Sequence, residues 1–194
     1  MRKLIIILLL LPHISYAQVK PWEKDAAPLH RAQKALTNVI IHDIFSPPVA
    51  SRIYAYTNIA AYEVLIQQNN GYYSLHNQVN SFPGIPAAVK KICTSLAAVN
   101  AFLITGKSLV FSETMLQDSI NNILQWYKNK KLSKEVYEAS LEYGNAVAAA
   151  VMHWAAQDKY RDTRSLRRYN YLKQEGKWMP TPPAYMAAVE PYWN

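Results

Sequence analysis

An all-α domain is the fold class that this 194-residue sequence predicts. No proline occurs between Ala87 and Met179, and the whole chain holds only five glycines. Strict alternation of apolar and polar residues, which is typical of a β-strand, is missing. Because proline and glycine interrupt helices, their scarcity favours long helices, and we expect a bundle of about five.

The first helix is expected over residues 28–43. Asp25 is a candidate N-cap, and Pro28 suits the first turn, where a backbone N–H has no partner within the helix. Ser46-Pro47-Pro48 is expected to end this helix, because a proline disfavours helical backbone in the residue before it.

The second helix is expected over residues 49–68 and is apolar on nearly every face. Arg52 and Glu63 are its only charged residues. A helix that is apolar all round is usually buried, so this one is predicted to form the centre of the bundle. Asn69-Asn70-Gly71 ends it, and a polar loop follows over residues 72–83.

Three more helices are expected over residues 86–105, 112–128 and 133–158. Ser112 and Ser133 are candidate N-caps of the last two. In the fifth helix, Gly144 and Ala148 form a notch of small residues that favours close contact with another helix. Cys93 is the only cysteine, so the chain can form no internal disulfide, and the apolar pattern around it predicts burial.

The chain divides into three parts by composition. Residues 1–17 form an expected signal peptide, residues 18–157 the helical bundle, and residues 158–194 an extended tail that is first basic and then rich in proline and aromatic residues. The signal peptide has a basic start at Arg2 and Lys3, an apolar run over residues 4–11, and the small residues Ser15 and Ala17 at the expected cleavage site.

This leader predicts an exported protein, either periplasmic or secreted. Its apolar run is too short to cross a membrane, which takes about 20 residues, so we expect no stable membrane anchoring after cleavage. The formal net charge of +8 includes the two basic residues of the leader. The modest positive excess that remains does not by itself indicate nucleic acid, and export argues against it.

Four polar residues are candidates for a buried polar cluster: His42, Asp43, Arg52 and Glu63. Arg52 and Glu63 lie about three helical turns apart, so each needs another partner, because an unpaired buried charge is costly. Structural ion pairs inside the bundle are one interpretation. The alternative is that one of the two faces a pocket completed by another part of the protein. We expect His42 to be buried and held by a neighbour rather than to ligate a metal.

The basic part of the tail offers a candidate anion-binding cluster, formed by Arg161, Arg164, Arg167 and Arg168. A solvated surface is the alternative interpretation of such a run. The histidines lack the spacing of a zinc site, and no Ser-His-Asp arrangement or pair of carboxylates can be identified. We therefore assign no catalytic, cofactor-binding or metal-binding residue from the pattern alone.

Two segments carry a resemblance to a known superfamily. Residues 42–56 read HDIFSPPVASRIYAY, and residues 178–185 read WMPTPPAY, followed by EPYWN at residues 190–194. Together they resemble the N-terminal half of secreted bacterial proteins in the superfamily of vanadium-dependent haloperoxidases and type 2 phosphatidic acid phosphatases (PAP2). The resemblance implies an all-α fold, and it covers nearly the whole mature chain.

The resemblance also implies chemistry that this sequence does not carry. Complete members bind vanadate, or form a phosphoenzyme, with a Lys followed seven residues later by Arg-Pro, with Pro-Ser-Gly-His, and with Ser-Arg followed five residues later by His. None of these motifs occurs here, since the stretch that starts at Ser51-Arg52 has Asn58 in place of the histidine. We therefore expect no cofactor in this chain, with vanadate bound only by a complete member.

Three functional hypotheses follow. The first is an exported N-terminal fragment, truncated where the catalytic half would follow and inactive alone. The second is half of a split enzyme that a downstream chain, a separate catalytic-half polypeptide, completes. The third is a non-catalytic periplasmic module that binds anions through its basic tail.

Overall fold

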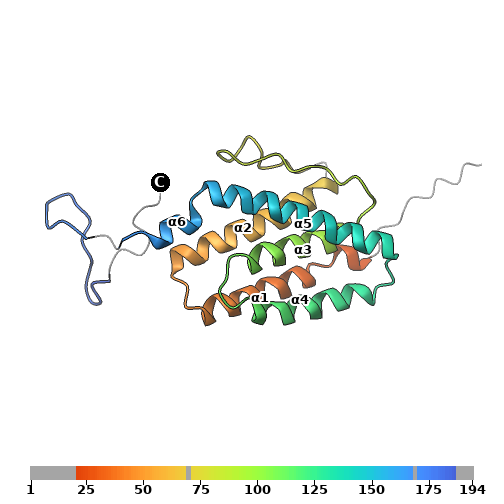
Figure 1. Cartoon of the computed structure of the whole chain (residues 1–194), viewed down its shortest axis with the longest axis horizontal. Coiled ribbons are helices and arrows are strands. Elements are labelled where there is room, and N and C mark those ends of the chain that lie inside the picture. The colour runs from red at the N-terminus through yellow and green to blue at the C-terminus, as the bar shows by residue number, and fades with distance from the viewer. Residues whose placement is uncertain (1–20, 69–70, 168–169, 187–194) are drawn as a thin grey trace, which may run out of the picture.

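Helix α3 (Thr94–Lys107) runs through the middle of the bundle in this computed structural model, which describes residues 21–68, 71–167 and 170–186 (Figure 1). Twelve of its fourteen residues are buried, and it packs against α1, α2, α4 and α5. The prediction that the second helix forms the centre is therefore wrong. Ala97, Ala98 and Ala101 make α3 thin enough for neighbours on every side, whereas α2 keeps Asn58 and Leu65 exposed.

The predicted all-α class is confirmed, because the described residues form helices and no strand. None of the described helices combines the length and the apolar character that crossing a bilayer requires. Besides α3, the elements are η1 (Pro21–Lys24), α1 (Ala27–His42), α2 (Pro47–Leu65), η2 (Ile66–Gln68), α4 (Glu113–Lys128), α5 (Lys134–Gln157) and α6 (Tyr160–Ser165).

The start of the third helix and the structure of the tail differ from the sequence prediction. The third helix begins at Thr94 rather than near residue 86, because the segment before it is held along α5. There Tyr143 donates a hydrogen bond to the Pro86 carbonyl, and the Cys93 N–H donates to Ser140 Oγ over 2.8 Å. Cys93 is buried, as expected. The second difference is α6, which lies where an extended tail was expected.

Helix α1 ends in a Schellman motif rather than at the prolines. The Ile44 N–H donates to the Ile41 carbonyl and the Phe45 N–H donates to the Ile40 carbonyl. Ile44 has φ +54°, the left-handed conformation that this motif usually gives to glycine. A β-branched residue there is strained by roughly 1–2 kcal/mol. Pro47 then occupies the first turn of α2, where proline is well tolerated.

The small-residue notch on α5 receives the backbone of α3. A Cβ atom added at Gly144 would lie 2.6 Å from the Ala97 carbonyl oxygen and 2.9 Å from Asn100 Nδ2. The Asn100 amide also donates to the Leu141 carbonyl and to Asn145, so it is fixed in this position. The absence of a side chain at Gly144 thus sets how closely the two helices approach.

Gly144→Ala should lower the free energy of unfolding by about 1–3 kcal/mol, because a backbone oxygen blocks the added methyl group and the helices must move apart. Urea unfolding monitored by circular dichroism measures this loss. Gly84→Ala is the matched control, since its nearest neighbours lie 3.9 Å away on the His76 ring and its stability should barely change. Equal stability of both variants would contradict this account of the notch.

Candidate functional site

The guanidinium of Arg52 joins α2 to the junction between α5 and α6. Its side chain is almost fully buried, and Nη2 lies 2.8 Å from both the carboxylate and the carbonyl oxygen of Asp158. Nη1 donates to Thr163 on α6 over 3.2 Å, and the guanidinium carbon lies 5.0 Å from the centre of the Tyr160 ring. We call these residues, together with Tyr56, the Arg52 cluster.

Tyr56 completes the Arg52 cluster from one turn further along α2. Its hydroxyl accepts hydrogen bonds from Arg52 and donates one to the Asp158 carboxylate. Burial, and the hydrogen bond to Asp158, raise the pKa of Tyr56 well above its usual value, so it remains a donor. Burial lowers the pKa of Arg52, but the Tyr56 hydroxyl and the Asp158 carboxylate outweigh it and raise the pKa. Arg52 therefore stays charged inside the bundle.

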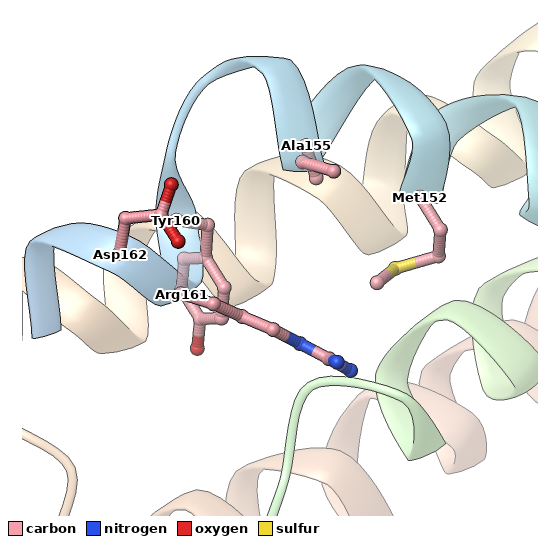
Figure 2. A pocket seen from close by; sticks show the side chains of 6 residues that line it. Met152, Ala155, Tyr160, Arg161 and Asp162 are labelled. Atoms are coloured by element: carbon pink, nitrogen blue, oxygen red, sulfur yellow. The ribbon is translucent and has the colours of Figure 1, made fainter. Parts of the chain in front are cut away.

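A pocket of about 270 Å³ lies beside this cluster, on the side of α6 that faces the turn after α3 (Figure 2). Its lining residues are Met152, Ala155, Ala156, Tyr160, Arg161 and Asp162. Arg161 extends from α6 across the pocket, and its guanidinium lies 3.4 Å from the Ser108 carbonyl oxygen. The wall is mostly apolar and carries one cation, Arg161, and one carboxylate, Asp162, so it suits contact with a side chain better than binding of a small anion.

The predicted arginine cluster is only partly described. Arg161 and Arg167 are exposed. The hydrogen bond of Arg161 goes to the Ser108 carbonyl and not to another member of the predicted cluster. The side chain of Arg164 and the whole of Arg168 lie outside the described residues. The grouping of these four residues as an anion site therefore stays a prediction.

The four polar residues expected to cluster lie at three separate places. Arg52 is in the cluster above, and His42 and Asp43 lie at the turn after α1. Glu63 is fully buried near the other end of α2 and accepts hydrogen bonds from Ser74 Oγ and the Leu75 N–H, over 2.9 and 2.7 Å. Of the two expected ion pairs, Arg52 thus makes one, while Glu63 anchors the loop after α2 through neutral donors.

Asp43 ties the turn after α1 to the turn before α4. Its carboxylate accepts hydrogen bonds from the N–H groups of Phe111 and Ser112 and from the Ser112 hydroxyl. His42 lies 3.2 Å from the same carboxylate, and its side chain is 60% exposed, which corrects the expectation of a buried His42. Asp43 is the C-cap of α1 and keeps a helical backbone, with φ −78° and ψ −1°.

These hydrogen bonds control the charge of Asp43. Burial raises the pKa of the carboxyl group, but donation from Ser112, from the Phe111 N–H and from His42 outweighs it and lowers the pKa. The site therefore prefers a carboxylate at neutral pH.

Sequence reasoning missed Asp158, Thr163 and Tyr160. Asp158 is 106 positions from Arg52, and no local pattern connects the two. Only Tyr56, four residues after Arg52 and so on the same helical face, carried a readable signal.

The sequence matches no protein-family model and no curated protein. A solved structure does match it. The chain matches a crystal structure described as the first bacterial vanadium-dependent iodoperoxidase, with 38% sequence identity and a TM-score of 0.76. The match covers 87% of this chain and 41% of that chain. The predicted resemblance is confirmed: this chain has a vanadium haloperoxidase-like fold and spans less than half the length of that relative.

Vanadate is the cofactor that this fold implies, and the described residues do not fit it. Arg52 is the only buried cation among them, and Asp158 already neutralises it. Vanadate needs a histidine ligand in addition to cations that neutralise it. The histidines of the described residues are all exposed: His30, His42, His76 and His153. Nor does the described part of the chain contain a group of three or more His, Cys, Asp or Glu side chains suited to a metal ion.

Asp158→Asn should lower the free energy of unfolding by about 1–2 kcal/mol, because it leaves a buried guanidinium without its counter-charge. The loss stays this small because Asp158 is half-exposed and solvent screens part of the interaction. Urea unfolding measures the effect. Glu142→Gln is the control, since it breaks the exposed pair with Lys90 and should change stability little. Equal losses for both variants would show that Arg52 does not depend on its partner.

Asp43→Asn should make the free energy of unfolding depend less steeply on pH below about pH 4. A carboxyl group with a folded pKa below its unfolded value of 3.8 stabilises the protein above that value. This stabilisation is lost as the pH falls from about 4 through the folded pKa. Urea unfolding between pH 2 and 6 should show a steeper acid loss for the wild type than for Asp43→Asn. Parallel profiles would contradict the assignment, and Ser112→Ala should give an intermediate slope because the backbone donors remain.

Proposed function

We propose, on the premise that this chain has a vanadium haloperoxidase-like fold, that it is the exported helical half of such a protein and has no catalytic activity alone. Its role is to pack against a second half that carries the oxyanion site. The observation that carries the proposal is the match to 41% of the iodoperoxidase chain, which leaves more than half of that chain outside the matched region.

Two features of the site support a supporting rather than a catalytic role. The half-exposed carboxylate of Asp158 neutralises the buried charge of Arg52, and Arg52 also holds α6 through Thr163, so this ion pair has a structural role. The pocket itself is open and mostly apolar. Such a surface is suited to contact with another folded unit, which the complete fold would supply.

The catalytic half can belong to the same polypeptide or to a separate one, and the reaction can be halide oxidation or phosphate-ester hydrolysis. The name of the matched relative favours halide oxidation for the assembled protein. Export through the leader at residues 1–17 is part of the proposal, because that segment has the basic start, apolar run and small residues of a signal peptide.

The purified chain should show no vanadate-dependent oxidation of iodide by hydrogen peroxide and no hydrolysis of p-nitrophenyl phosphate. A chimera should be active in the iodide assay when this chain replaces the matched region of the iodoperoxidase, because its missing half is then present. The native iodoperoxidase is the positive control. Vanadate-dependent turnover by this chain alone would contradict the proposal, and so would an unfolded, inactive chimera.

A further inference from the structure

Apolar side chains with large exposed fractions lie at one end of the bundle, on the last turn of α1, on the turn that follows it and on the turn before α4. We call Ile41, Ile44, Phe45 and Phe111 the turn patch. Ile41, Ile44 and Phe111 are 69%, 87% and 66% exposed, and the rings of Phe45 and Phe111 stack with centroids 4.9 Å apart. Figure 1 shows that the turn after α1 and the turn between α3 and α4 lie at the end from which α6 and residues 170–186 leave the bundle.

The turn patch is held in a fixed shape. The Asp43 carboxylate accepts the N–H groups of Phe111 and Ser112, which locks one turn onto the other. The Schellman hydrogen bonds of Ile44 and Phe45 fix the remainder. A rigid apolar surface loses little conformational entropy when a partner covers it, so it is already organised for binding.

Ile44 is the unusual member of this patch. Its backbone is in the left-handed conformation, which strains a β-branched side chain, and that side chain makes little contact with its own bundle. Glycine would satisfy the same Schellman motif without strain. An isoleucine here strains the backbone while its side chain stays 87% exposed, which is the pattern expected where binding, rather than folding, selects the residue.

We infer that the turn patch is the surface on which the catalytic half of the haloperoxidase-like fold docks, with Ile44 as its apolar anchor. The inference rests on the proposed function. The solved iodoperoxidase has such a remainder outside the matched region, and this chain leaves the bundle beside the patch. The departing segment carries its own exposed apolar residues: Leu166, Tyr171, Leu172, Trp178, Met179, Tyr185 and Met186. A partner that packs along this segment would also contact the turn patch, because the two lie at the same end of the bundle.

The test compares Ile44→Gly in two proteins, the chain alone and the chimera with the iodoperoxidase remainder. In the chain alone, Ile44→Gly should raise the melting temperature by about 1–4 °C, because it relieves the strained backbone. In the chimera it should lower the melting temperature, because it removes the anchor. Ile44→Asn should behave in the same way, since asparagine tolerates the left-handed conformation but is polar.

Lys131→Gly is the matched control, because Lys131 also has a positive φ, of +56°, but carries a charged side chain. It should shift the melting temperature in the same direction in both proteins. If Ile44→Gly stabilises a chimera that still oxidises iodide, the docking surface lies elsewhere and the proposed function survives. An inactive, unfolded chimera would remove the proposed function itself. A dimer of the chain alone that Ile44→Gly dissociates, measured by light scattering, would make a second copy the occupant and overturn the inference.

Discussion

The charge of Arg52 stays inside the bundle only because Asp158 arrives from the end of α5 to neutralise it. Burial of an unpaired guanidinium would be costly, so the folded state requires α2 and the α5–α6 junction to meet at this point. Thr163 and Tyr160 then attach α6 to the same guanidinium. The direction in which the chain leaves the bundle therefore depends on one ion pair between residues 106 positions apart.

The rest of that end of the molecule is built around a second carboxylate. Asp43 joins the turn after α1 to the turn before α4, and the apolar side chains of Ile44 and Phe111 are thereby displayed together. One end of the bundle thus combines fixed turns, an open pocket and a departing segment with exposed apolar residues. Exposed apolar side chains gathered at one end of a bundle mark an interaction surface, which supports the proposal that this end packs against another unit.

Local signals were sufficient for several helices. Ser133 caps α5 through the Val136 N–H, as its position predicts, and the proline-free stretch corresponds to helices α3 to α6. Local signals failed where tertiary contacts compete with propensity. Segment 86–93 has an apolar, helix-like pattern, but its contacts along α5 keep it out of the helix. Helix α6 forms in a basic stretch because Arg52 holds Thr163 and because Tyr160 is buried.

The sequence by itself determined the all-α class, the approximate ends of α1, α4 and α5, and the resemblance to the haloperoxidase superfamily, because these depend on caps, prolines, periodicity and motifs that are local in the chain. It also indicated that Arg52 and Glu63 needed partners. Only the tertiary structure decided what those partners are, which helix is central, and that His42 is exposed while Asp43 is held. These features depend on contacts between residues far apart in sequence. A buried charge in the sequence requires a hydrogen-bonding or ionic partner, but it does not indicate which residue that partner is.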